Sequence, residues 1–138
     1  MPAKLKVYSD GGARGNPGPA AAAFLILSES GEVLKAESRF LGERTNNQAE
    51  YEALIAALEA AAQLCAEEII CHLDSELVGK HLTGEFKVRN ADLRRLWSKV
   101  QELKRCFKRV SFVNVPRINK YIQEADGLVN EQLDQTAK

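Results

Sequence analysis

The feature that most constrains the fold is an acidic residue at the end of a predicted strand, directly before a glycine-rich loop. Residues 5–9 (LKVYS) have strand character and lead to Asp10, after which Gly11 and Gly12 relax the steric limits on the backbone. Glycines and prolines stiffen the following turn, and residues 20–27 form a second apolar run. The stretch therefore predicts two strands joined by a shaped loop. Asp10 alone is explained equally well as a solvated acid in a tight turn, so acids elsewhere have to decide its role.

The chain has the length and composition of one globular domain. Its 138 residues are 45% hydrophobic and 28% charged, so we expect a single domain over residues 1–138. No apolar run is long enough to span a membrane and the N-terminus lacks a signal-peptide pattern, which predicts a cytoplasmic protein without a membrane partner. Nothing in the sequence demands a dimer, and a monomer is expected. The cysteines lack metal-ligand spacing and lie in apolar patterns, which predicts buried reduced thiols at Cys65, Cys71 and Cys106.

Positive charge is concentrated in one segment, although the net charge of the chain is zero. Residues 80–109 contain ten of the nineteen Lys and Arg residues and only three acids, a local charge of +7. Such a segment is either a solvated helix face with an excess of Lys or a surface that binds phosphates. Trp97 falls on the predicted buried stripe of this segment, whereas Phe86 lies in a loop and is the better candidate for stacking on a base.

The order of the predicted elements indicates an α/β fold. Three antiparallel strands precede a long helix that starts at a capping box formed by Thr45 and Gln48. The next strand is expected to run parallel to the first, because strand-helix-strand crossovers are right-handed. The predicted buried stripe of the long helix consists of Tyr51, Leu54, Ile55, Leu58, Ala62 and Cys65. The predicted strands cover residues 5–9, 20–27, 33–40, 67–74 and 110–115, and the later helices cover residues 75–83, residues 92–106 and the chain after a polar loop at 117–123.

Four acids stand at strand ends or at helix borders that face the sheet: Asp10, Glu50, Asp74 and Asp126. If they converge, their mutual repulsion requires divalent cations, and oxygen ligands favour Mg²⁺ or Mn²⁺ over zinc. The matching chemistry is phosphoryl transfer with two metal ions. The convergence itself follows only from the predicted topology.

The segments that carry these acids resemble the successive motifs of type 1 ribonuclease H. They are YSDGGARGNPGPAAAAF, TNNQAEYEALIAAL, LDSELV and EADGLVNEQL, and they occur in order over nearly the whole chain. The resemblance implies a five-stranded mixed sheet, three antiparallel strands then two parallel, with helices on both faces. It also implies an endonuclease that cleaves the RNA strand of RNA–DNA hybrids, leaving 5′-phosphate and 3′-hydroxyl ends. The implied cofactors are two Mg²⁺ ions, with Mn²⁺ as a substitute, held by the same four acids.

The same resemblance assigns contacts with the substrate. Asn16, Asn46 and Asn47 are expected to read ribose 2′-hydroxyls, which distinguish RNA from DNA. Thr45, with Arg44, is expected to bind a phosphate of the DNA strand, and capping of the helix is a second role for Thr45. Ser75 and Arg117 complete the expected contacts with the hybrid.

The chain departs from the family pattern in two loops. Many members carry a histidine before the last helix, but residues 117–124 contain none, and Arg117, Asn119 or Lys120 could take its place. Residues 84–91 are too few for the basic protrusion of many bacterial members. Both features resemble a compact archaeal and bacterial subtype that sometimes acts on other RNA duplexes, so double-stranded RNA is a second expected substrate. A non-catalytic hybrid-binding module and a DNA nuclease of the resolvase or integrase type are the alternatives.

Overall fold

The computed structural model, which describes residues 3–64 and 66–137, contains a five-stranded mixed sheet. Its strand order is β3-β2-β1-β4-β5, with β1, β2 and β3 antiparallel and with β4 and β5 parallel to β1. This topology confirms the expected sheet. The strands are β1 Lys4–Ala13, β2 Gly18–Ser28, β3 Val33–Arg44, β4 Glu68–Leu73 and β5 Arg109–Asn114.

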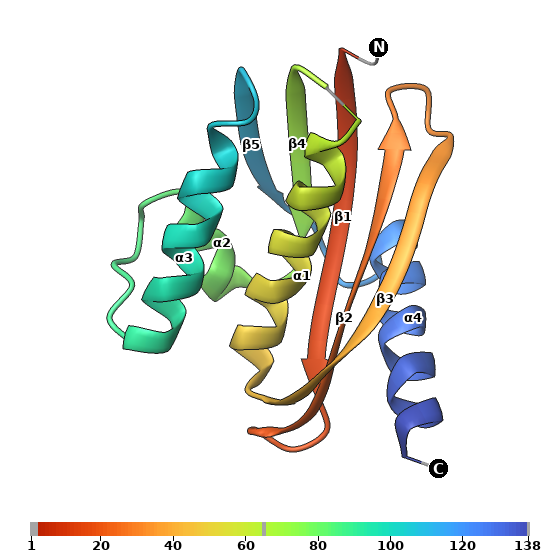
Figure 1. Ribbon diagram of the computed structural model, residues 1–138, viewed down its shortest axis with the longest axis vertical. Coiled ribbons are helices and arrows are strands. Elements are labelled where there is room, and N and C mark those ends of the chain that lie inside the picture. Colours follow the sequence, from red (N-terminus) through yellow and green to blue (C-terminus); the bar gives the residue numbers. More distant parts are fainter. Residues whose placement is uncertain (1–2, 65, 138) are drawn as a thin grey trace.

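Helices cover both faces of the sheet (Figure 1). On one face lie α1 (Asn46–Ala62) and, packed beside it, α3 (Ala91–Lys104). The short α2 (Glu76–Leu82) follows β4, and α4 (Lys120–Thr136) packs on the opposite face against β1, β2 and β3. No helix in the described ranges has the length and apolar character needed to cross a membrane.

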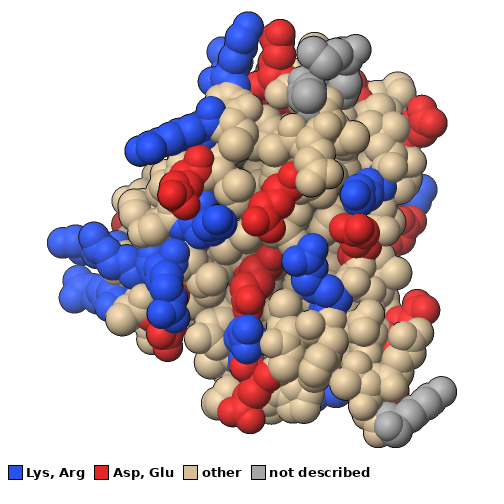
Figure 2. All heavy atoms as spheres, viewed as in Figure 1, with Lys and Arg blue, Asp and Glu red and all other residues tan. Residues whose placement is uncertain are grey.

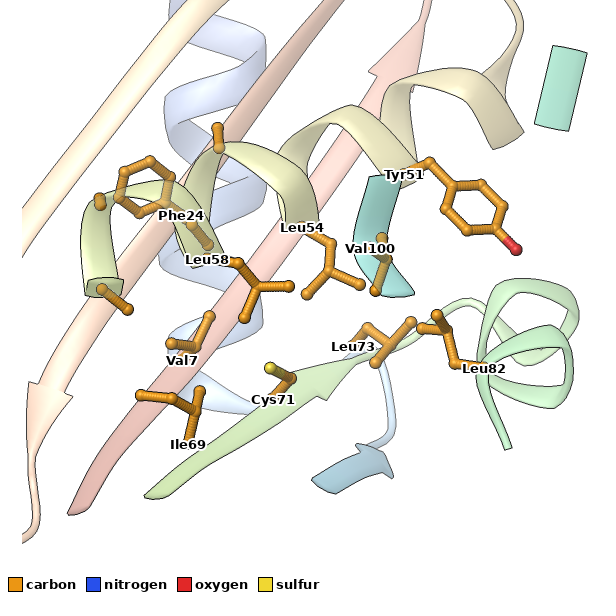
Figure 3. Packing of buried hydrophobic residues seen from close by; sticks show 14 of the residues in the cluster. Val7, Phe24, Tyr51, Leu54, Leu58, Ile69, Cys71, Leu73, Leu82 and Val100 are labelled. Carbon is orange, nitrogen blue, oxygen red and sulfur yellow. The ribbon is translucent and has the colours of Figure 1, made fainter. Parts of the chain in front are cut away.

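Apolar side chains fill both spaces between sheet and helices. On the α1 face, Leu54 and Leu58 form one cluster with Val7, Ile69 and Leu73 (Figure 3). The clusters on the α4 face are smaller and contain Ala21, Ala23, Ala125, Val129 and Leu133 in one, and Tyr8, Leu25, Leu27 and Ile122 in the other.

The alanine-rich sequences of β2 and α1 belong to elements that are covered on two sides. Residues 20–23 of β2 are buried because α1 lies over one face of the strand and α4 over the other. Most of the surface of α1 is also buried, because the sheet lies on one side of it and α3 packs beside it. The single stripe expected from the sequence is therefore too narrow. Tyr51, Leu54 and Leu58 are buried as predicted and Ile55 is half-buried, but the buried set also includes Ala49, Ala53, Ala56, Ala57, Ala60 and Ala61.

The prediction of buried cysteines is only partly right. Cys71 is fully buried in the core, and burial raises the pKa of its thiol, as expected for an unreactive residue. Cys106 follows the end of α3 and is exposed, because the chain turns toward β5 there. Cys65, also expected in the stripe of α1, lies outside the described residues.

The last helix begins earlier than the sequence indicates. Residues 117–123 were expected to form a polar loop, but α4 starts at Lys120. Asn119 caps it, since its Oδ1 accepts hydrogen bonds from the N–H groups of Tyr121 and Ile122. Polar residues on both sides of Tyr121 and Ile122 concealed the start of the helix, and the Asn119 cap is the signal that identifies it.

Gly11 lets the central strand pass directly beneath the first turn of α1. A Cβ atom at this position would overlap the main-chain carbonyl group of Ala49 and lie 2.7 Å from the nitrogen of Glu50. Both obstacles are backbone atoms in a helix, so neither can move aside cheaply. Glycine at this position therefore determines how closely β1 and α1 approach.

We expect Gly11→Ala to lower the free energy of unfolding by about 1–3 kcal/mol or more, because the methyl group forces β1 and α1 apart. Gly127→Ala is the matched control, since a Cβ there meets nothing within 4 Å and alanine favours a helix over glycine by about 1 kcal/mol. Urea unfolding followed by circular dichroism measures both. Equal stability of Gly11→Ala and the unmodified protein would contradict this account of the contact.

Candidate active site

Three carboxylates from separate elements meet at one edge of the central strands. Asp10 belongs to β1, Asp74 directly follows β4, and Glu50 lies in the first turns of α1. Because β1 and β4 are parallel with Tyr8 opposite His72, Asp10 and Asp74 come level with each other. One oxygen of each acid lies within 4.8 Å of the oxygens of the other two. The structure thus brings three of the four predicted acids into one cluster.

Asp10 and Glu50 are almost inaccessible to solvent, with exposed fractions of 2% and 8%. The main chain orients Glu50, whose Oε1 accepts a hydrogen bond of 2.9 Å from the N–H of Gly11. Asp10 Oδ1 and Glu50 Oε2 are buried without a hydrogen-bond partner among the described residues. Buried polar atoms usually have partners, so these two oxygens indicate a place prepared for a ligand.

The pKa values of the two buried acids are raised. Burial raises the pKa of Asp10 to about 7, and the charges of Asp74 and Asp126 contribute to the increase. Burial, followed by the charge of Asp10, raises the pKa of Glu50 as well. Carboxyl groups this close resist ionising together unless a cation lies between them, and a shared proton is the alternative that relieves their repulsion.

Asp126, the fourth predicted acid, approaches the cluster from α4 and is joined to it by Arg117. Nη2 of Arg117 donates to Asp126 Oδ1 at 3.0 Å, and Nη1 donates to Asp74 Oδ2 at 2.9 Å. Burial alone would lower the pKa of Arg117, but the charges of Asp10, Asp126 and Asp74 raise it. The sequence singled out Arg117 in the loop before the last helix. That its guanidinium joins two acids could not be predicted without the fold.

A cleft of about 570 Å³ opens over the acids, between the first turn of α1 and α4. Four predicted substrate-binding residues line it, namely Asn46, Asn47, Ser75 and Arg117. Glu50, Asp74 and Asp126 contribute to its wall as well. The acids and these polar side chains are therefore accessible from one opening.

Asn16 and Asn46 connect the glycine-rich loop to the start of α1. Oδ1 of Asn16 accepts from the N–H of Asn46 at 2.9 Å, and Oδ1 of Asn46 accepts from the N–H of Ala13 at 2.8 Å. The NH₂ group of each amide donates no hydrogen bond within the part of the chain that the structure describes. Each side chain is thus fixed by its oxygen, with donors left for a ligand.

Thr45 and Ser75 both cap helices, which is one of the two roles expected for Thr45. Thr45 Oγ1 accepts from the N–H of Gln48 to complete the capping box of α1, and Ser75 Oγ accepts from the N–H of Val78 in α2. Arg44 does not reach the cleft. It donates from Nε to Glu52 at 2.8 Å and lines a separate pocket beside the start of α3.

Two residues in the wall of the cleft were missed from the sequence: Arg14 and Asn130. Arg14 extends from the glycine-rich loop to α4, where Nη2 donates to Asp134 Oδ1 at 2.7 Å. These residues are more than a hundred positions apart in the chain, and no local pattern signals their contact.

Lys and Arg side chains gather on the side of the molecule where α3 lies (Figure 2). Leu93 and Val100 of this helix are buried, whereas its exposed positions include Arg94, Arg95 and Lys99. In the preceding loop Phe86 is 47% exposed, with the ammonium group of Lys80 4.9 Å from its ring centroid. The positive segment found in the sequence therefore forms a real surface patch.

Comparison with known proteins assigns the chain to a family. The model of a family described as reverse transcriptase-like matches residues 8–132. Ribonuclease HI of Halobacterium salinarum is 44% identical over 131 residues, which are 95% of this chain and 65% of that protein. The chain thus spans slightly less than two thirds of this relative's length.

Solved structures of ribonuclease H1 proteins also match the chain closely. The crystal structure of RNase H1 from the same halophilic archaeon superposes with a TM-score of 0.92 at 44% identity, covering 96% of this chain and 98% of that one. LC11-RNase H1, whose structure was solved in complex with an RNA/DNA hybrid, gives a TM-score of 0.90 at 39% identity, covering 97% of this chain and 99% of that one. From this agreement in both sequence and fold, the chain belongs to the type 1 ribonuclease H family.

Proposed function

We propose that the chain is an endonuclease that hydrolyses the RNA strand of RNA–DNA hybrids, leaving 5′-phosphate and 3′-hydroxyl ends. The observation that carries this proposal is the cluster of Asp10, Glu50 and Asp74, whose oxygens lie within 4.8 Å of one another beside a polar cleft. Asp126, linked to Asp74 through Arg117, is the fourth member of the site. The hybrid bound to LC11-RNase H1, a relative with the same fold, supports the choice of substrate.

The acids fit a pair of hard divalent cations, Mg²⁺ or its substitute Mn²⁺. Their ligand atoms are all carboxylate oxygens, and two of these are buried without a partner in the described chain. Asp10, Glu50, Asp74 and Asp126 would hold the ions. When bound, two such ions activate the attacking water and stabilise the leaving oxygen.

Arg117 is the residue of this chain best placed to bind the phosphate that is cleaved. Its guanidinium is fixed by two carboxylates, while its side chain remains 67% exposed at the edge of the cleft. A guanidinium can offer further N–H donors to a phosphate oxygen without giving up both ion pairs. We propose that Arg117 serves in this loop where many family members carry histidine.

The asparagines supply the proposed selectivity for RNA. Hydrogen bonds hold the Oδ1 atoms of Asn16 and Asn46, which leaves their NH₂ groups for a ligand, and Asn47 lines the cleft next to Asn46. Such donors suit ribose 2′-hydroxyls in a wide, shallow minor groove. Fixing the side chains before binding lowers the entropic cost of recognition.

Contacts with the second strand are proposed at the helix caps and the basic patch. The hydroxyl of Thr45 accepts a bond within its own helix, and a hydroxyl that accepts can also donate to a phosphate. Ser75 is placed similarly in the cleft wall. Arg44 pairs with Glu52 at a separate pocket, so its proposed contact is with a part of the hybrid that extends beyond the cleft. Phosphate contacts carry no preference for deoxyribose, which is consistent with double-stranded RNA as a second substrate.

We expect Asp10→Asn to stabilise the metal-free protein by about 1–2 kcal/mol, because it removes one charge from a crowded, unpartnered cluster. Addition of Mg²⁺ should raise the melting temperature of the unmodified protein more than that of the variant. Thermal unfolding in EDTA and in Mg²⁺ measures both effects. Glu59→Gln, which removes an exposed acid from the same helix as Glu50, is the control and should respond to Mg²⁺ like the unmodified protein. An equal response of Asp10→Asn would argue against metal binding at this cluster.

We expect Asp10→Asn to lose cleavage of a labelled hybrid by several orders of magnitude while still binding it. The substrate panel contains the hybrid, double-stranded RNA and branched DNA, each in Mg²⁺ and in Mn²⁺. Binding of the hybrid without cleavage by the unmodified protein would favour a non-catalytic module, and preferential cleavage of branched DNA would favour a DNA nuclease. Near-normal activity of Asp10→Asn would overturn the role given to this residue.

A further inference from the structure

The carboxylate of Asp126 is held on both of its oxygens. Arg117 donates to Oδ1 at 3.0 Å, as described above, and Nδ2 of Asn130 donates to Oδ2 at 3.3 Å. Nδ2 of Asn130 also lies 3.1 Å from the main-chain oxygen of Asp126. We propose that Asn130 is a positioning residue, which orients Asp126 toward the cations; this inference rests on the proposed function.

Asp126 needs such support more than the other acids do. Asp10 is fixed within a central strand, and Glu50 is fixed by the N–H of Gly11. Asp126 instead projects from α4, which contacts the sheet only through side chains, and it is only partly buried. Donors on opposite oxygens restrict the rotation of a carboxylate, and Asn130, one turn further along α4, is the donor on its own helix.

The amide of Asn130 is itself oriented by Arg14. Nη2 of Arg14 lies 3.5 Å from Oδ1 of Asn130 and 3.4 Å from its main-chain oxygen, and it is anchored by Asp134 at 2.7 Å. A guanidinium has only donors, so it selects the amide orientation in which Oδ1 faces Arg14. In that orientation Nδ2 faces Asp126. The glycine-rich loop, through Arg14, thus determines which end of the amide meets the carboxylate.

The contact could instead be a local bond of a surface asparagine to its own helix, without consequence for the site. Two substitutions separate these cases. Asn130→Leu keeps nearly the same size and removes the donor, whereas Asn130→Asp places a second acceptor beside Asp126. Gln132→Leu is the matched control, because Gln132 is an amide on the same helix that bonds to Ser38 of β3, away from the cleft.

The decisive measurement is Mn²⁺ binding to the free protein by isothermal titration calorimetry, which does not depend on catalysis. If Asn130 orients Asp126, Asn130→Leu should weaken Mn²⁺ binding about tenfold or more, the usual effect of losing a partner of a metal ligand. Asn130→Asp should not restore it. The melting temperature of Asn130→Leu in EDTA and its affinity for the hybrid should equal those of the control, Gln132→Leu. In cleavage assays, the loss should appear as a higher Mg²⁺ requirement or a lower kcat, with KM unchanged.

Mn²⁺ binding by Asn130→Leu within twofold of Gln132→Leu would overturn the inference. That result, with normal hybrid cleavage by the unmodified protein, would leave the proposed function intact. Failure of the unmodified protein to cleave the hybrid while Asn130→Leu binds Mn²⁺ tenfold more weakly would overturn the function and retain the positioning role.

Discussion

The close approach of β1 to the first turn of α1 at Gly11 is the constraint on which the site depends. Without a side chain at this position, the strand can run against the backbone of Ala49 and Glu50. The N–H of Gly11 then fixes Glu50, whose carboxylate comes to lie beside that of Asp10, the preceding residue of the strand. The alanines of β2 and α1 serve the same packing, since small side chains allow helices to cover both faces of the sheet closely.

This packing leaves charge that the protein balances only in part. Asp10 and Glu50 are buried beside each other with raised pKa values, and two of their oxygens lack partners in the described chain. Two arginines lie in the cleft wall. Arg14 pairs with Asp134, and Arg117 reaches Asp74 and Asp126 but forms no ion pair with Asp10 or Glu50 among the described residues. The remaining negative charge is what makes divalent cations the natural complement of the site.

The sequence predicted the sheet and the helix caps well, because each leaves a local trace. Strand periodicity, the capping box at Thr45 and acids at strand ends are all visible within short windows. The misses come from packing between distant segments. α3 packs against one flank of α1, and Arg117 joins acids from two elements. Arg44 was expected at the substrate, but the turn into α1 brings Glu52 within reach and the ion pair directs the arginine to another pocket.

We propose that these acids hold divalent cations, which would activate the water that cleaves the RNA strand of a hybrid. The most direct measurement is mass spectrometry of the fragments that the unmodified protein releases from a hybrid, in Mg²⁺ and in EDTA. We expect RNA fragments with 5′-phosphate and 3′-hydroxyl ends in Mg²⁺ and intact RNA in EDTA. Fragments ending in a 2′,3′-cyclic phosphate would contradict this proposal, because the ribose hydroxyl rather than a metal-activated water would then be the nucleophile. Cleavage that persists in EDTA would contradict it as well, because divalent cations would then not be required.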